Sequence, residues 1–493
     1  METLTPADFV EGFEFAGSTS RRVFVKGLGF VSAAVVLGTL GGCEELAEAI
    51  RNRPVRRHLR VGSAEVDADI ATYRQAVTAM KALPINDPRN WAAQAAIHGS
   101  IAGGFKYCEH GNDHFFDWHR VYLLYFEKIC QKLTGNPRFG LPYWNWNQTP
   151  DIHPAFLDTA STLFLARTRS GMTGSSSIVT GTLDPIFADA NFFTFRQQLE
   201  GTPHNTVHGF IGGTMGTGGS ALDPLFWTHH CMVDYCWYKW NVDLGNSNTN
   251  DPAWINHVNS HFVDADGNPA TATAGISILM PLLSYQYESS AIGSAAAAAA
   301  IRTKAEYQRL EKRLRRGADI RFKVTRRVRL ADKVVASIAK PLSLEARLSA
   351  EDFAGIVNSD VARDRIFASV AYAQLPATSD FAVRVFVNLP VANRSTSNDD
   401  PHYAGSFAFF GTEPTNAPAV DEAVHRHQPQ FLVDLTSAIQ RLRKSQELNS
   451  GSPLSLQLVP TPFAEGFERD DTALVLNGVD IIVTPVIING SMR

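Results

Sequence analysis

The sequence is poor in several features that mark familiar classes of protein. It has only five cysteines in 493 residues, too few for a scaffold held by disulfides, and the odd number leaves at least one outside any set of internal pairs. The net charge of −4 provides no basic face of the kind that nucleic-acid binding requires, so no such partner is expected. Hydrophobic residues at 44% are normal for a globular chain, and the length predicts two or three domains.

The N-terminal segment has the pattern of an export signal. Residues Ser20 to Lys26 read serine, arginine, arginine, any residue, phenylalanine, hydrophobe, lysine, which is the twin-arginine pattern. The apolar run that follows, Gly27 to Leu40, is too short and too rich in glycine for a stable membrane span. These features predict export of an already folded protein by the bacterial twin-arginine route, to the periplasm or the extracellular medium.

Cys43 ends this segment. Residues Leu40 to Cys43 resemble a lipobox, which would make Cys43 a lipid anchor in the membrane; the alternative is a chance cysteine near an ordinary cleavage site. We assign residues 1–43 to the signal and the polar, arginine-rich residues 44–57 to a linker.

The rest of the chain divides into a helical part and a part rich in strands. Apolar periodicity predicts helices over four segments, with long loops across residues 134–200. They are Val61–Leu83, Trp91–Ile97, Phe116–Leu133 and Ala221–Val242.

Alternating apolar and polar residues appear after about residue 320 and predict strands. They include segments starting at Phe322, Phe381, Leu454 and Ile481. We therefore expect a mainly α domain over residues 58–320, with a four-helix-bundle core and long loops, followed by an all-β sandwich over residues 321–493.

The helical part is rich in histidine: nine of the 15 histidines lie between His98 and His230. His204 and His208 are four residues apart and would share one face of a helix, so both could reach one metal ion. His110 precedes His119 by nine residues, so a loop could fold it back beside the helix that His119 opens.

The type of metal follows from the donors. Imidazoles suit copper, zinc, iron and nickel. The chain has no His-Glu-x-x-His helix of the kind found in zinc proteases, and no paired glutamates of the kind found in di-iron bundles. Two sets of three neutral imidazoles would leave open positions for dioxygen on a pair of copper ions.

Two long segments carry a family resemblance. Residues His110 to Glu127 resemble the first copper-site signature of the tyrosinase, catechol oxidase and haemocyanin superfamily, and residues Asp223 to Asp234 resemble the second. The resemblance covers about residues 58–320 and is similar in look to exported bacterial polyphenol oxidases with a trailing β-domain.

The resemblance implies a type 3 site of two copper ions, with O2 as co-substrate. It assigns three histidines to each copper; the first three hold one ion and the last three the other. They are His98, His110 and His119, then His204, His208 and His230. His114 and His229 do not match the ligand positions, and we interpret them as structural.

Other residues are expected to tune the chemistry. In several family members a cysteine placed like Cys108 forms a thioether to the histidine at the position of His110; the alternative is a free buried thiol. Residues placed like Glu200 and Asn205 hold a water that takes the proton of a monophenol in tyrosinase-like enzymes. Asp234, four residues after His230, is expected to orient that imidazole from the same helix face.

Two further segments bear on access to the site. The loop Ile211–Ser220 is mostly glycine, which predicts an open mouth. In related proteins the trailing β-domain caps the copper site and inserts a side chain, and the aromatic residues Phe407, Phe409 and Phe410 are candidates, although each would also suit the core of the sandwich.

The expected activity is therefore that of a tyrosinase-type polyphenol oxidase, which uses O2 to ortho-hydroxylate monophenols and to oxidise o-diphenols to o-quinones. One alternative is a catechol or o-aminophenol oxidase without hydroxylase activity; a remote one is an oxygen carrier similar to haemocyanin. Small phenols are the expected partners, with a copper chaperone as a candidate partner in maturation.

Overall fold

A computed structural model describes residues 52–493 except 176, 179–180, 290–308, 310, 319–322, 338, 360–363, 374–375, 377, 412–429, 450, 464–472, 486, 489–490 and 493. The export signal with Cys43, most of the linker and the expected domain boundary lie outside the described residues. Within them, no helix is both long enough and apolar enough to cross a membrane.

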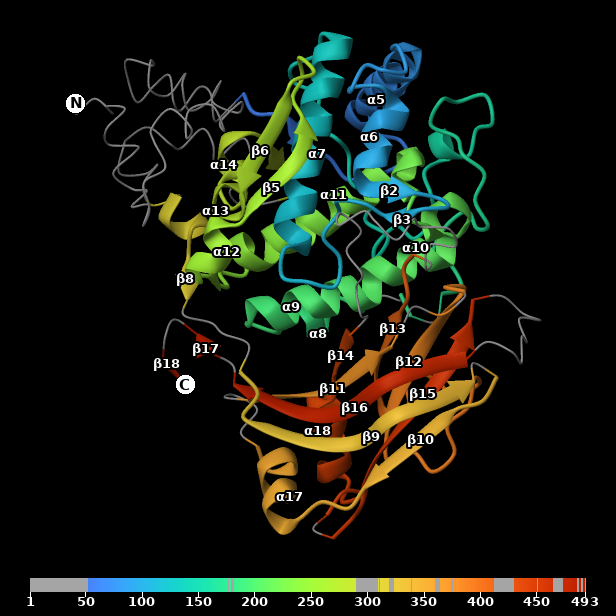
Figure 1. Ribbon diagram of the computed structural model, residues 1–493, viewed down its shortest axis with the longest axis vertical. Coiled ribbons are helices and arrows are strands. Elements are labelled where there is room, and N and C mark those ends of the chain that lie inside the picture. Colours follow the sequence, from blue (N-terminus) through green and yellow to red (C-terminus); the bar gives the residue numbers. More distant parts are fainter. Residues whose placement is uncertain are drawn as a thin grey trace.

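The first half of the described chain is helical, and Figure 1 shows its helices gathered above a β-rich half. Its principal helices are α5 (Ala64–Ala82), α6 (Trp91–His98), α7 (Phe115–Thr134), α9 (Phe192–Leu199), α10 (Asn205–Ile211) and α11 (Pro224–Tyr238). Helix α7 packs against both α5 and α11, and every residue of α11 is buried.

Local sequence fixes where the two central helices begin or end. Helix α11 begins after Asp223, whose side chain accepts a hydrogen bond from the amide of Leu225, and Pro224 occupies its first turn, where no amide hydrogen is needed. Helix α7 ends at Gly135, which takes a left-handed backbone with φ 65°. His119 and His230 are thereby held on two packed helices.

A π-helical turn joins α9 to α10. It spans Glu200–His204 and contains Pro203, which lacks the amide hydrogen that a regular α-turn would use. The three segments follow one another without a break and form one helical rod, Phe192–Ile211. It carries Glu200, His204, Asn205 and His208, so the π-helical turn lies within the segment expected to hold the second metal.

The β-rich half consists of two four-stranded antiparallel sheets whose apolar faces enclose a second core. One sheet has the order β10 (Leu342–Ala346), β15 (Leu454–Pro462), β12 (Phe381–Val387), β13 (Tyr403–Ala408). The other has the order β14 (Gln430–Asp434), β11 (Asp364–Tyr372), β16 (Ala473–Pro485), β9 (Arg326–Ser337). This half also contains two helices, α17 (Ala350–Val357) and α18 (Thr436–Lys444), in addition to the strands of the expected sandwich.

The two halves meet along the rod that carries the histidines. Helix α9 contacts β14, and α10 contacts β13 and β12 (Figure 1). Glycines permit the close approach: a Cβ on Gly209 would lie 2.8 Å from the carbonyl oxygen of Ser379, and one on Gly201 would lie 3.2 Å from Phe431. The β-rich half therefore covers the helix from which part of the expected metal site is built.

Candidate metal centre

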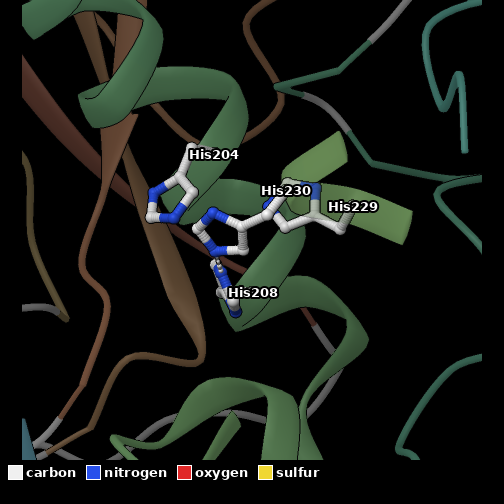
Figure 2. Close-up of side chains that lie close together, drawn as sticks. All are labelled: His204, His208, His229 and His230. Carbon is white, nitrogen blue, oxygen red and sulfur yellow. Dashed lines mark hydrogen bonds between the residues drawn. The ribbon is translucent and has the colours of Figure 1, made fainter. Parts of the chain in front are cut away.

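Seven buried histidines form two groups whose ring nitrogens could each hold a metal ion. One group contains His98, His110 and His119; the other contains His204, His208, His229 and His230 (Figure 2). Within each group the candidate ligand atoms lie within 4.8 Å of one another. The groups adjoin, since the rings of His119 and His230 are stacked with centroids 4.4 Å apart.

Hydrogen bonds fix the tautomers of four of these rings. The Nδ1 atoms of His98, His119 and His208 lie 2.7–2.9 Å from the backbone carbonyls of Gly218, Phe115 and Met215, and Nδ1 of His204 lies 2.9 Å from Oδ1 of Asn205. An oxygen of this kind only accepts, so each Nδ1 carries the hydrogen and each Nε2 presents a lone pair.

These lone pairs lie in the buried interior of the protein. Nε2 of His98, His119 and His204 is buried without a hydrogen-bond partner among the described residues, and Nε2 of His208 and Nε2 of His230 face each other at 3.2 Å (Figure 2). The first three nitrogens are buried polar atoms without a partner, which a bound cation would satisfy, and a cation could equally replace the hydrogen shared between His208 and His230. The donor set consists of neutral imidazoles, which suits copper.

His229 belongs to the second group by distance but not by its hydrogen bonding. Nε1 of Trp146 donates to Nδ1 of His229 at 3.1 Å, and an indole N–H can only donate. Neutral His229 therefore carries its hydrogen on Nε2 and offers no lone pair to a metal. The remaining trio, His204, His208 and His230, mirrors the first group.

The buried imidazoles predict an acid-labile fold. Burial lowers the pKa of His98 to about 4 and that of His204 to about 3, whereas an unfolded imidazole titrates near ~6.5. As the pH falls from about 6.5 to about 4, the unfolded chain binds protons that the folded chain does not, so the free energy of unfolding of the metal-free protein should fall, by about 3 kcal/mol from His98 alone. Urea unfolding at both ends of this window measures the effect; equal unfolding free energies would contradict it.

Asp234 does not orient His230, so that expectation was wrong. Its two oxygens accept hydrogen bonds from Arg120, Arg56, Tyr285 and Tyr287, while Nδ1 of His230 has no hydrogen-bond partner among the described residues. Burial favours the neutral acid, but Arg120 and Arg56 outweigh it and lower the pKa of Asp234. Asp234 neutralises two buried arginines beneath the metal centre.

The glycine-rich loop packs closely against the segment that contains Ile101 and Gly104. A Cβ on Gly218 would lie 2.4 Å from the backbone of Gly104, and one on Gly219 would lie 2.8 Å from the backbone of Ile101. These glycines are needed for close approach of two backbone segments. The loop then aims the carbonyls of Gly218 and Met215 at two of the histidines.

Glu200 is buried and firmly held. One carboxylate oxygen accepts from the amide of Gly111 at 2.6 Å, and the other accepts from Arg196 at 2.7 Å. Burial raises the pKa of Glu200, against the opposing charge of Arg196. Asn205, at the start of α10, accepts from His204 through Oδ1 and donates through Nδ2 to the carbonyl of Ala408 at 2.8 Å.

Cys108 is buried beside the first trio, with its sulfur 3.1 Å from the carbonyl oxygen of His98. Burial raises the pKa of the Cys108 thiol. The other described cysteines, Cys130, Cys231 and Cys236, are also buried and form no disulfide.

An aromatic side chain from the β-rich half lies among the histidines, and the sequence could not single it out. The ring of Phe410 is stacked on that of His208 with centroids 3.7 Å apart and an interplanar angle of 16°. The centroid of the Phe410 ring also lies 5.3 Å from that of His110 and 5.4 Å from that of His204. Phe407 and Phe409 instead pack in the core of the sandwich.

Comparisons with known proteins agree with this geometry. Residues 88–182 and 161–243 match the model of the common central domain of tyrosinase. The chain is 30% identical over 285 residues to tyrosinase HcTyr1 of Hahella sp. (strain CCB-MM4), covering 45% of this chain and 61% of that one. It is 31% identical over 260 residues to a chloroplastic polyphenol oxidase of Malus domestica, and the match covers 41% of this chain and 44% of that one. The chain thus spans less than two thirds of the curated relatives it matches.

The overall fold also has solved counterparts. A latent aurone synthase (polyphenol oxidase) matches with a TM-score of 0.61 at 20% identity, covering 88% of this chain and 91% of that one. Latent apple tyrosinase matches with a TM-score of 0.58 at 19% identity, and the match covers 88% of this chain and 97% of that one. At these identities the likeness concerns the fold alone: a helical domain followed by a β-domain.

Proposed function

We propose that the chain is a member of the tyrosinase family, with a type 3 site of two copper ions, and that it is a copper-dependent phenol oxidase. Its reactions would be ortho-hydroxylation of monophenols and oxidation of o-diphenols to o-quinones, with O2 as the oxidant. The observation that carries the proposal is the pair of adjoining groups of buried imidazoles, within each of which the candidate ligand atoms lie within 4.8 Å of one another.

Each trio would hold one copper ion: His98, His110 and His119 the first, and His204, His208 and His230 the second. Bound there, the copper pair supplies the redox chemistry with O2. The chain contributes orientation, through the carbonyls that fix the ring tautomers, and exclusion of water, through aromatic walls such as Phe226, whose ring lies 4.2 Å from that of His230.

Glu200 and Asn205 would manage the proton of an incoming monophenol. A phenol has a pKa near ~10, so forming the phenolate at neutral pH needs a base. The Glu200 carboxylate is held beside the loop of His110, and Asn205 adjoins His204. A water shared by these two side chains would take the proton.

Replacing Glu200 by glutamine should separate the two activities. The amide keeps the shape but not the basicity, so monophenol hydroxylation should fall about 100-fold. Catechol, whose oxidation does not depend on this base in the same way, should be oxidised within about twofold of the original rate. Parallel assays with tyrosine and catechol measure this, and an equal loss of both would assign Glu200 a structural role.

A catechol or o-aminophenol oxidase without hydroxylase activity is the alternative. It is favoured by the hydrogen bonds of Glu200 and Asn205, since both carboxylate oxygens and the Asn205 amide already have protein partners. Tyrosine that is never hydroxylated while catechol is oxidised rapidly would decide for it. Reversible oxygenation without turnover of either phenol would favour the carrier function instead.

We further propose that residues 58–320 form the oxidase domain and residues 321–493 a β-domain that caps it. Phe410 fills the space beside His208, and the main chain of β13 is hydrogen-bonded to Thr202 and Asn205. Two solved proteins with this fold are described as latent forms. The full chain would accordingly be a latent enzyme.

Cys108 is proposed to form a thioether with His110 during maturation. Forming one carbon–sulfur bond removes two hydrogens, so the copper-matured peptide that contains both residues should be lighter by two hydrogen masses and should resist thiol alkylation. Cys130, buried in the same domain, is the matched control and should remain alkylatable after unfolding. An unmodified Cys108 in active, copper-loaded protein would exclude the bond.

Export by the twin-arginine route, with a candidate lipid anchor at Cys43, remains a proposal from the sequence. Fractionation of cells that carry Arg21→Lys and Arg22→Lys, compared with Cys43→Ser, would separate a failure of export from a failure of anchoring.

A further inference from the structure

The loop that precedes helix α7, residues 106–114, is held by the segment 252–263, which is far away in the sequence. Nε1 of Trp254 donates a hydrogen bond to the main-chain carbonyl of Asp113 at 2.8 Å. Trp254 is itself buried, so the loop is fixed at this point to the body of the helical half. Apart from His110, no proposed metal ligand belongs to either stretch.

Two histidines of the segment are stacked on rings of the loop. His261 lies on Tyr107, with centroids 3.8 Å apart and an angle of 5° between the planes. His257 lies on His114, with centroids 3.6 Å apart and an angle of 18°. His261 takes a φ of 70°, which residues other than glycine rarely adopt, at an irregularity of its strand. The two stacks join the loop and the segment face to face.

His114 is surrounded by carboxylates. Its Nδ1 lies 3.2 Å from Oδ2 of Asp117, whose side chain is fully buried. Asn259, from the segment, donates to the same oxygen at 2.7 Å. Burial alone would lower the pKa of His114, but the hydrogen bond with Asp117 and the charges of Glu109 and Asp113 outweigh it and raise that pKa.

The pair of stacked imidazoles can take up one proton more readily than two. The side chains of His114 and His257 are 20% and 32% exposed, so protons reach the pair from solvent. Nε2 of His257 lies 3.9 Å from Oε1 of Glu109, while Asp113 is paired with Arg196 of α9 at 2.9 Å. Two charged rings in contact would repel, so the second proton binds only at a lower pH than the first.

From these contacts we propose that the segment 252–263 is a pH-sensitive clasp on the loop 106–114, closed by a single proton on the His114–His257 stack. In the closed clasp the proton on His114 faces Asp117 and lies over the ring of His257. When the clasp opens, water reaches these groups and the pKa of His114 returns to about 6.5. This inference does not depend on the proposed phenol oxidase function.

The direction of the pH effect follows from the raised pKa of His114. The proton stabilises the closed clasp fully below about pH 6.5, and this stabilisation is lost as the pH rises through the pKa that His114 has in the closed clasp. The clasp should therefore hold the loop more firmly in mildly acidic than in mildly alkaline medium.

Hydrogen exchange in the full-length, copper-loaded protein measures the closure. Protection of the amides of residues 109–118, corrected for the intrinsic pH dependence of exchange, should be higher at about pH 6 than at about pH 8. The change should be up to about tenfold for each pH unit that separates the pKa of His114 in the closed and open states. Equal protection at the two pH values would overturn the proposal.

Three variants identify the group that takes the proton. His114→Gln can still donate to Asp117 but cannot titrate, so its protection should be the same at both pH values. His257→Phe and His261→Phe keep a ring in each stack and should keep the pH dependence. A pH effect of the copper centre would persist in His114→Gln, and such persistence would overturn the proposal, as would loss of the effect in His257→Phe or His261→Phe.

A second measurement covers the case in which His114→Gln loosens the loop at every pH. Magnetic resonance of ring-labelled histidine in the unaltered chain, with the His114 signal assigned by its absence from the variant, follows the titration of that ring directly. His114 should titrate above the ordinary imidazole pKa of about 6.5. Titration at or below that value would overturn the clasp.

Discussion

Phe410→Ala should raise catechol oxidation by the full-length protein roughly 100-fold, the factor expected if only about one molecule in a hundred has an open site while the ring is present. The ring of Phe410 is stacked on His208 and lies against His110 and His204, which places it where a phenol would have to bind. Because the ring of Phe410 is tethered to the chain through β13, it has a high effective concentration at the site. A free phenol must compete with it for the same position.

The control for this variant is Phe407→Leu. Phe407 lies in the same segment but packs in the sandwich core against Phe431, with centroids 4.5 Å apart, so its replacement should lower stability by about 1 kcal/mol without opening the site. Catechol oxidation should then remain at the low level of the unaltered chain. Equal activation by both variants would mean that loosening of the β-domain, rather than vacancy of the site, causes the increase.

Removal of one imidazole should have the opposite effect. His204→Ala deletes a ligand of the second copper, so the metal content should fall to about one copper per chain and catechol oxidation should fall about 1000-fold or more, because the reaction needs both ions. Metal analysis after dialysis, with activity measured in the Phe410→Ala background, gives both quantities.

His229→Gln is the matched variant for this experiment. The glutamine oxygen can still accept from Trp146, and the neutral His229 ring offers no lone pair to the metal. Copper content should stay at about two per chain and activity within about threefold. A loss of copper as large as that in His204→Ala would show that His229 is a ligand and that its assigned tautomer is wrong.

Much of the helical framework could be predicted from apolar periodicity. The expected helix Phe116–Leu133 is found as α7, Phe115–Thr134, and Trp91–Ile97 is found as α6, Trp91–His98. Of the strands, two begin where they were predicted to begin, β12 at Phe381 and β15 at Leu454. The spacing of His204 and His208 correctly placed both on one side of a helical rod, although the π-turn at Pro203 was not foreseen.

What the sequence could not provide depends on contacts between distant segments. Asp234 has the spacing of a partner for His230, but Arg56, far away in the chain, competes for it with a stronger charge. Trp146, remote from His229 in the sequence, decides which nitrogen of that ring is protonated. Phe410 lies on His208 whereas Phe407 and Phe409 lie in the sandwich core. This difference depends on how β13 packs against α10, a contact between distant segments that the sequence does not reveal.

The copper content of the purified, dialysed protein tests the central claim most directly. Metal analysis should find two copper ions per folded chain, and the electron paramagnetic resonance signal of the oxidised protein should be weak, because two adjacent copper ions couple their spins. One copper per chain with a full signal, or a different metal bound by these histidines, would contradict a binuclear copper centre.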